Sequence, residues 1–164
     1  MKKHIYAAII FVCSLTFDLV TKYFAVAHIA LHERIDVAGS FVQFTLTYNR
    51  GGLFGIMQGY QSFFLILSIL VLALLILFYI FEKNKTYLFC NSIALIIGGA
   101  IGNVMDRISG RVGVVDFITI GSDSFYRWPT FNIADAVIVV GAFLLIIVYY
   151  QDEKMRKLQK KSDQ

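Results

Sequence analysis

The sequence predicts an all-α integral membrane protein, with four transmembrane helices and a small β-sheet in the first outward connection. Two observations lead to this prediction. First, 58% of the 164 residues are hydrophobic, which is more apolar surface than a soluble domain of this length can bury, because small domains have a high surface-to-volume ratio. Second, the apolar residues gather in four long runs that are separated by charged or polar connections.

Each of the four runs is long enough to cross a hydrocarbon core of about 30 Å, which requires about 20 helical residues. Helices are expected because a backbone in lipid must satisfy its own hydrogen bonds. An alternative interpretation treats the N-terminus as a signal peptide cleaved after Ala25-Val26-Ala27, but Asp18 and Lys22 interrupt the region before that site. We expect a single membrane domain, 1–164, with spans at about 5–27, 62–81, 87–105 and 131–150 and a frayed cytoplasmic tail at 151–164.

Basic residues are unevenly distributed among the connections. Lysine-rich flanks border the N-terminus, the second connection and the C-terminus, with Lys2, Lys3, Lys83, Lys85, Lys154, Arg156, Lys157, Lys160 and Lys161. The other two connections contain only arginines as basic residues, namely Arg34, Arg50, Arg107, Arg111 and Arg127. The positive-inside rule therefore predicts that both termini are cytoplasmic and that residues 28–61 and 106–130 face outward. The net charge of +4 follows this pattern, so membrane lipid is an expected partner and nucleic acid is not.

Residues 41–48 alternate between apolar and polar side chains, which is typical of a half-buried strand. Val42, Phe44, Leu46 and Tyr48 fall on the face expected to be buried. Residues 35–37 can pair with this strand across a turn at 38–40, and the strand ends at a turn-forming cluster at 49–52. We expect a small sheet over about 35–52 that rests on the membrane surface with its apolar face down.

Candidate catalytic groups are found by elimination. The three histidines have no paired serine motif, and the sequence has no HExxH or similar metal-ligand cluster, so no metal and no cofactor is expected. Carboxylates remain. Four acids lie within or beside apolar sequence, where an ionisable group is costly and is a functional candidate until a partner explains it: Asp18, Asp106, Asp116 and Asp135.

Two of these acids have structural interpretations. Lys22 follows Asp18 by four residues on the same helical face, in the favourable order for an ion pair, and its chain is expected to extend toward the outer interface. Asp106 precedes Arg107 directly, so a charge pair at the end of the third span is expected. A catalytic role for either acid is the alternative interpretation.

The third span also carries small and polar residues at helical spacing. Gly98 and Gly102 form a GxxxG pattern, which lets another helix approach closely. Asn103 and Arg107 share one face of the same helix and direct an amide and a cation toward the outer zone.

Asp116 and Asp135 are the candidate catalytic pair. Asp116 lies in a short apolar run, and burial would raise its pKa by disfavouring the charged form. Asp135 has an alternative interpretation as the capping-box partner of Asn132 at the start of the fourth span. Two adjacent carboxyl groups share a proton, so one can act as a base on water while the other polarises an amide carbonyl.

These residues resemble those of the lipoprotein signal peptidases, also called signal peptidase II. Five blocks occur in the order seen in that family and span nearly the whole chain: Asp18–Lys22, Asn49–Gly55, Gly98–Arg107, Val114–Phe117 and Pro129–Asp135. The resemblance implies a membrane aspartic endopeptidase of the bacterial cytoplasmic membrane, with its active site toward the outer face. Its substrates would be prolipoprotein precursors, cut just before a diacylglyceryl-modified cysteine.

By the same resemblance, the catalytic residues are Asp116 and Asp135, and the residues that hold substrate or support the dyad are Asn49, Asn103, Arg107, Asn132, Asp18 and Lys22. A monomer is expected. The chain departs from the family at 51–54, where Gly-Gly-Leu-Phe replaces the usual Gly-Ala-Ala-Phe. The extra glycine, Gly52, is expected to loosen the turn, and Leu53 adds bulk.

Two other classes of function compete with a peptidase. A transporter or channel would use Asp18, Asp135 and Arg107 to line an ion path, although four spans are few for a transporter. A purely structural membrane partner would need neither Asp116 nor Asp135.

Overall fold

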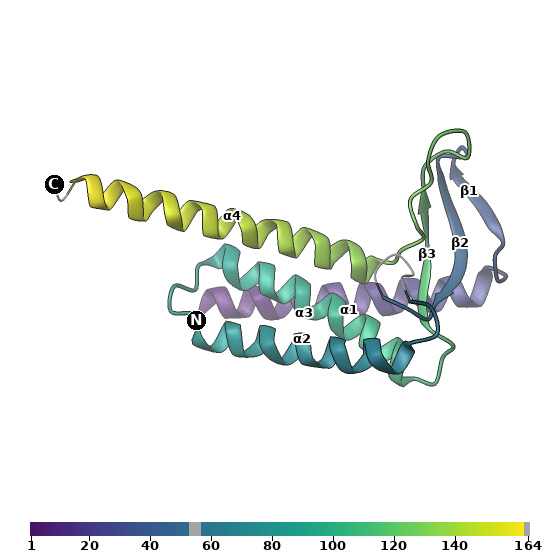
Figure 1. The fold of residues 1–164 in the computed structure, drawn as a ribbon, viewed down its shortest axis with the longest axis horizontal. Coiled ribbons are helices and arrows are strands. Elements are labelled where there is room, and N and C mark those ends of the chain that lie inside the picture. The colour runs from purple at the N-terminus through teal and green to yellow at the C-terminus, as the bar shows by residue number, and fades with distance from the viewer. Residues whose placement is uncertain (53–56, 163–164) are drawn as a thin grey trace.

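The computed structural model describes residues 1–52 and 57–162. In chain order the elements are α1 (Lys2–His28), β1 (Arg34–Ala38), β2 (Val42–Asn49), α2 (Gln61–Phe81), α3 (Tyr87–Ile108), β3 (Val114–Ile120) and α4 (Ile133–Ser162) (Figure 1). In this part of the chain, four helices are long and apolar enough to cross a membrane. The predicted fold class, four spanning helices with a small sheet, is confirmed.

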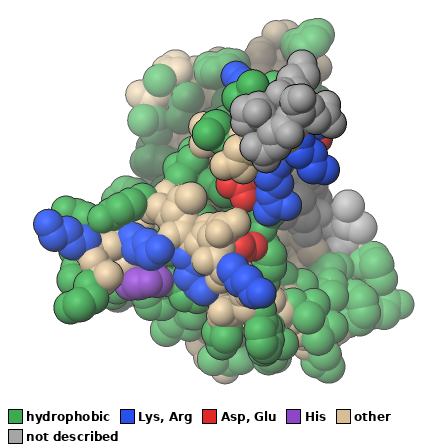
Figure 2. Space-filling model, turned by 90° about the vertical axis from the view of Figure 1, so that its left-hand side faces the viewer, with side chains coloured by type: hydrophobic (Ala, Val, Ile, Leu, Met, Phe, Trp, Pro, Cys, Tyr) green, Lys and Arg blue, Asp and Glu red, His purple; other side chains and the backbone are tan. Residues whose placement is uncertain are grey.

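The helices run alongside one another, and α3 lies between the others, packing most extensively on α4 and α1. Both termini lie at one end of the bundle, here called the terminal end, and the sheet lies at the other, the sheet end (Figure 1). The strands run across the helix axes. Figure 2 looks onto the terminal end, where lysine and arginine side chains gather.

Small residues on α3 allow this close packing. A side-chain carbon at Gly98 would lie 2.3 Å from Ser14 Oγ, and one at Gly102 would lie 2.3 Å from Asp18 Oδ2, so both glycines face α1. A side-chain carbon at Gly99 would lie 2.5 Å from the Ala134 carbonyl oxygen at the start of α4. The GxxxG pattern therefore marks a close helix contact, and α3 uses a second side of its glycine surface for α4.

The helix bounds differ from the expected spans at several ends. α4 begins at Ile133 because Asn132 caps it, and it continues as helix to Ser162. Lysine, arginine and glutamate are good helix formers, which favours this continuation. α2 is apolar on all sides and has no fully buried side chain; one side of it packs on α3 and borders the cavity described below, and its other side is exposed.

The sheet is antiparallel with the order β1–β2–β3. Sequence patterning identified β1 and β2 but missed β3, which appeared only as a short apolar run around Asp116. The missed strand is nearly buried throughout, so its sequence has no alternation of apolar and polar side chains to reveal it.

The expected burial of β2 is partly wrong. Of its four alternating apolar side chains only Leu46 is buried, whereas the polar Gln43 and Thr45 are buried and Val42 and Phe44 are half-buried. The pairing of β2 with β3 has a register irregularity between Phe44 and Thr47. A bulge of this kind breaks simple alternation, and the strand is covered on both edges because β1 and β3 flank it.

Candidate active site

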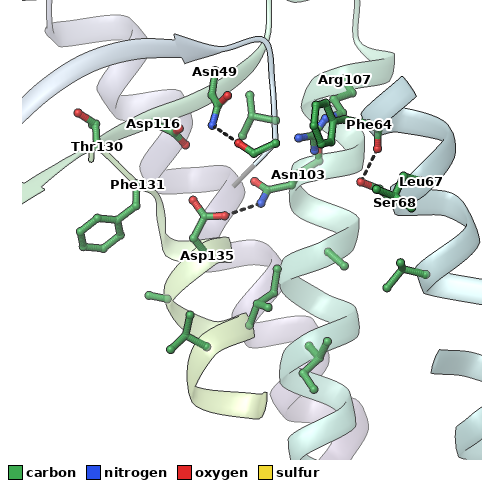
Figure 3. A pocket seen from close by; sticks show the side chains of 18 of the residues that line it. Asn49, Phe64, Leu67, Ser68, Asn103, Arg107, Asp116, Thr130, Phe131 and Asp135 are labelled. Atoms are coloured by element: carbon green, nitrogen blue, oxygen red, sulfur yellow. Dashed lines mark hydrogen bonds between the residues drawn. The ribbon is translucent and has the colours of Figure 1, made fainter. Parts of the chain in front are cut away.

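A cavity of about 710 Å³ opens between α2, α3 and α4 at the sheet end (Figure 3). Most of its wall is apolar and runs down along the helices. Its polar side chains include both candidate catalytic acids and three of the candidate supporting residues: Asn49, Asn103, Arg107, Asp116 and Asp135. The structure therefore brings polar side chains from four elements, β2, α3, β3 and α4, to one cavity.

Asp116 reaches this cavity from β3 and is only 2% exposed. Its Oδ1 accepts a hydrogen bond of 2.6 Å from the Asn132 side-chain amide. Burial, followed by the charge of the neighbouring Asp135, raises the pKa of Asp116 from 3.8 to about 7, while hydrogen bonding by Asn132 and Asn49 acts in the opposite direction. A proton is thus readily held on Asp116 near neutral pH.

Asp135 lies in the first turn of α4. Its backbone N–H donates to Asn132 Oδ1 at 2.9 Å, and its Oδ2 accepts from the Asn132 N–H at 3.2 Å, which forms a reciprocal capping box. Its Oδ1 accepts a second bond of 2.9 Å from the Asn103 amide (Figure 3). The capping interpretation is correct, and the same side chain also lines the cavity.

Asn132 and Asn103 connect the two acids. The Asn132 amide nitrogen donates to Asp116 Oδ1 and lies 3.1 Å from Asn103 Oδ1, and the Asn103 amide nitrogen donates in turn to Asp135. Asn132 is fully buried. A short chain of amides therefore fixes how each carboxyl group is oriented.

Lys22 is buried, with 1% of its surface exposed, and the expectation that it extends toward the interface is wrong. Its Nζ lies 2.8 Å from Asp18 Oδ2, 2.9 Å from Asp106 Oδ2 and 2.9 Å from Asn103 Oδ1. The expected Asp18–Lys22 ion pair is present. Asp18 also accepts the backbone N–H of Ala134 at 2.8 Å, so this acid stabilises the start of α4 as well.

The expected pair of Asp106 with Arg107 is not the one that the structure shows. Asp106 pairs with Lys22 and with Arg111, whose Nη1 lies 2.9 Å from Asp106 Oδ1. Arg107 instead donates to the carbonyl oxygens of Asn103 and Gly51, each at 3.2 Å. Neighbouring helical residues point in different directions, which explains why sequence adjacency misled here.

The turn after β2 closes the cavity on one side. The Asn49 side chain donates to the Gly52 carbonyl at 3.1 Å and accepts from the Gly51 N–H at 3.0 Å. A side-chain carbon at Gly52 would lie 2.3 Å from the Phe64 ring, so this glycine is packed rather than loose. The other unusual residue, Leu53, lies outside the described residues.

Sequence reasoning named Asp106 as a candidate but missed its partners, and it gave Arg111 no role in the site. Asp106 was assigned to a local pair, and Arg111 was counted only as a loop arginine, yet together they hold the buried end of Lys22 and the start of β3, whose Val115 N–H lies 3.3 Å from Asp106 Oδ2. The signal available in the sequence was the depth of Asp106 in an apolar span, which called for a partner that adjacency could not identify.

The fold and the site together define a multi-pass membrane protein in which two carboxyl side chains open onto a largely apolar cavity. Residues 10–151 match the family model described as signal peptidase (SPase) II. The chain belongs to the signal peptidase II family, whose members cleave signal peptides from prolipoproteins, and it is therefore a peptidase.

Individual relatives agree with this membership. The chain is 41% identical to the lipoprotein signal peptidase of Clostridium tetani over 153 residues, which cover 90% of this chain and 97% of that protein. It is 33% identical to the lipoprotein signal peptidase of Listeria welshimeri over 154 residues, 93% and 97% of the two chains. A bacterial membrane enzyme solved by the in meso method at 2.3 Å resolution superposes with a TM-score of 0.78 at 34% identity, covering 90% of this chain and 89% of that chain.

Proposed function

We propose that the chain is an aspartic endopeptidase whose catalytic residues are Asp116 and Asp135, and that it cuts prolipoproteins just before a diacylglyceryl-modified cysteine. One observation carries the proposal. The buried carboxyl group of Asp116 and the half-buried one of Asp135 reach the same cavity from different elements, and both are hydrogen-bonded to Asn132. The cleavage position comes from the family resemblance, and the apolar cavity beside the acids is consistent with a lipid-modified substrate.

The charge balance supports a shared proton. Four acids are linked in this region, Asp18, Asp106, Asp116 and Asp135, and three cations lie among them, Lys22, Arg107 and Arg111. Full ionisation would leave one uncompensated negative charge in a buried site. One retained proton removes this uncompensated charge. A pair of carboxyl groups that shares one proton is also the state that peptide hydrolysis needs.

The hydrogen bonds suggest where this proton rests. Asp135 accepts two bonds, one on each oxygen, and lies in the first turn of a helix, where the dipole favours negative charge. Asp116 accepts the Asn132 bond on Oδ1, and its pKa of about 7 keeps a proton available. We therefore assign the proton to Asp116 and the negative charge to Asp135 in the resting enzyme.

Hydrolysis then proceeds in two steps, the formation and the breakdown of a tetrahedral intermediate, and each step involves two proton transfers. Asp135 takes a proton from water as the water oxygen attacks the scissile carbonyl carbon, and Asp116 gives its proton to the carbonyl oxygen. In the tetrahedral intermediate the roles are exchanged. Asp135 protonates the departing amine, the C–N bond breaks, and Asp116 recovers a proton from the new hydroxyl group, which restores the starting state.

The supporting residues have distinct proposed roles. Asn103 and Asn132 orient the two carboxyl groups, and Lys22 with Asp18 fixes Asn103 and the start of α4. Asn49 and Arg107 hold the turn that borders the cavity, and their side chains remain close enough to the cavity to meet a substrate. No metal or cofactor is required by this scheme.

The cavity favours a substrate embedded in the bilayer. Its wall continues from the acids along apolar side chains of α2 and α4, including Leu67, Val71, Ile138 and Val139. Asp135 is the third residue of α4, about 3–5 Å along the helix from its first residue. A signal peptide in the membrane can therefore present its end to the acids without leaving lipid.

We also propose the orientation and location of the protein. Lysines flank every helix end at the terminal end, which is the pattern of a cytoplasmic side, and Figure 2 shows basic side chains gathered on that face. The sheet end and its cavity then face outward from the bacterial cytoplasmic membrane. All proposed site residues come from one chain, which suits a monomer.

Cleavage of a purified precursor tests the proposal. The protein in detergent is mixed with a diacylglyceryl-modified prolipoprotein, and the released signal peptide is measured. Asp116→Asn and Asp135→Asn should each reduce the turnover number by a factor of about 10⁴ or more, while the protein remains folded. Asp123→Asn, which alters an exposed acid in the same connection, is the matched control and should retain activity.

Two outcomes would contradict the proposal in different ways. Near-normal turnover of either dyad variant would exclude that aspartate as a catalytic residue. Equal cleavage of the precursor without its diacylglyceryl group would leave the dyad intact but exclude the proposed substrate class.

A further inference from the structure

Three aromatic side chains form an exposed tip at the far end of the sheet. Phe125, Tyr126 and Trp128 are 95%, 56% and 47% exposed, respectively, and are here called the aromatic tip. The Tyr126 and Trp128 rings contact each other at 6.2 Å in an edge-to-face arrangement. So much exposed aromatic surface in one short segment indicates a binding surface.

The tip is a structured loop. The Gly121 and Arg127 positions pair across it, the Ser122 N–H donates to the Tyr126 carbonyl at 2.9 Å, and the Trp128 N–H donates to the Ile120 carbonyl at 2.7 Å. It is also held to the neighbouring turn, because the Gly121 N–H donates to the Phe41 carbonyl at 2.9 Å. These bonds fix the loop that carries the three rings.

The loop has a polar side and an aromatic side. Arg127 lies between the two aromatic residues in sequence, and its Nε lies 2.8 Å from Asp123, which also pairs with Arg34 at 3.5 Å. The Tyr126 and Trp128 rings contact each other, so these two side chains lie on the same side of the segment. Trp128 lines the cavity between the helices, so this shared face is the one turned toward the bundle.

The sheet extends sideways from the bundle. Its strands run across the helix axes, and the loop after β3 lies beyond the side of α4 (Figure 1). Because the helices cross the bilayer, the loop that lies beyond α4 is placed over lipid, whereas β2 and β3 pack on α1 and the start of α4.

Exposed aromatic side chains on the helices mark the same level of the bilayer. On α1 they include Tyr23 and Phe24 at the sheet end and Tyr6 at the terminal end. Tyr6 and Tyr23 are separated by about 25 Å of helix, close to the thickness of a hydrocarbon core. Aromatic residues gather at both membrane interfaces, and the aromatic tip lies at the end that carries Tyr23.

We propose that Phe125, Tyr126 and Trp128 insert into the lipid headgroup region at the sheet end and anchor the sheet on the bilayer. Phospholipid at the interface is the partner, and it suits rings that have an apolar body and, in Tyr126, a polar atom. The anchor holds the mouth of the cavity at the membrane surface. It is independent of the proposed peptide chemistry.

The single tryptophan of the chain provides a direct test. The whole protein is placed in bilayer nanodiscs of phosphatidylcholine brominated near the glycerol end of its chains, and Trp128 emission is compared with that in unbrominated lipid. We expect about half of the emission to be quenched by the bromines, with little further quenching by aqueous acrylamide.

A second variant distinguishes quenching at the aromatic tip from quenching in the cavity, because Trp128 belongs to the tip and also lines the cavity. Phe125→Trp in a Trp128→Phe background moves the only tryptophan to the most exposed position of the tip. Leu158→Trp in the same background is the matched control, because Leu158 is exposed on the end of α4 beyond the bundle. Brominated lipid should quench the first variant at least about twofold more than the second.

Strong acrylamide quenching without bromine quenching of the Phe125→Trp variant would overturn the proposal and leave the tip in solution. Quenching by neither agent would also overturn it, because a protein surface would then cover the tip. The fluorescence does not depend on turnover, so a failure of the proposed dyad would leave these results unchanged.

Discussion

The Lys22 ammonium group lies 2.9 Å from the side-chain oxygen of Asn103. Lysine can only donate, so this contact requires the Asn103 oxygen to face Lys22 and the Asn103 nitrogen to face the other way, toward Asp135. One buried cation on α1 thereby sets which end of an amide on α3 meets a carboxyl group on α4. The relationship links three helices to the orientation of one proposed catalytic acid.

Replacing Lys22 with methionine should destabilise the protein strongly. The change leaves Asp18 and Asp106 buried without their shared cation, and breaking a buried ion pair costs about 3–5 kcal/mol. We expect a large decrease in the midpoint of thermal unfolding in detergent and a smaller decrease in turnover per folded molecule. Lys83→Met, an exposed lysine at the terminal end, is the control. A stable Lys22→Met protein with lost turnover would instead assign Lys22 to the chemistry.

Replacing Asn103 should affect turnover more than substrate binding. Asn103→Ala removes the bond to Asp135, and the loss of a buried hydrogen bond to a charged group is expected to lower kcat by about 10- to 100-fold with little change in KM. Steady-state cleavage kinetics measure both constants. Asn91→Ala makes the same change near the other end of α3 and should leave kcat intact. An equal loss for both variants would show a general effect on the helix.

Turnover should fall as the pH rises above about 7. The pKa of Asp116 is raised to about 7 by burial and by Asp135. The proposed mechanism needs the proton on Asp116, so the fraction of active enzyme, and with it kcat/KM, should decrease on the alkaline side. A pH profile between about 5 and 9 measures this. A flat profile through neutrality would contradict the assignment of the proton to Asp116.

The same shift predicts the sign of a stability change. The folded protein holds the Asp116 proton more tightly than the unfolded chain does, because the pKa rises from 3.8 to about 7 on folding. The contribution of this group is therefore fully present at low pH and is lost as the pH rises through about 7. Asp116→Asn should remove that dependence, which denaturation at several pH values can measure.

Restoring the family's usual alanine at position 52 should not be neutral in this chain. The added methyl group would lie 2.3 Å from the Phe64 ring, so Gly52→Ala should displace a ring that lines the cavity and should raise KM more than it lowers kcat. The double variant Gly52→Ala with Phe64→Leu should recover part of the loss, since the two changes touch the same space. Additive effects would show that Gly52 acts through something other than Phe64.

Much of the fold follows from local patterns. Four apolar runs of membrane-spanning length predict the helices, and alternation over 41–48 predicts β2 as a strand, because lipid exposure and strand pleating each leave a simple mark on sequence. The carboxyl pair could also be found, since Asp116 and Asp135 are acids in apolar surroundings. β3 could not be found in this way, because a strand buried on both faces has no alternating pattern.

What only the tertiary structure decided is which polar groups meet. The sequence by itself determined that Asp18, Lys22, Asp106 and Asn103 are costly in lipid and need partners. It could not show that Lys22 serves all three of the others, or that Asp106 pairs with Arg111 rather than with Arg107 beside it. A buried charge is satisfied by whichever group lies nearest in space, and that distance is set by the packing of helices that are remote along the chain.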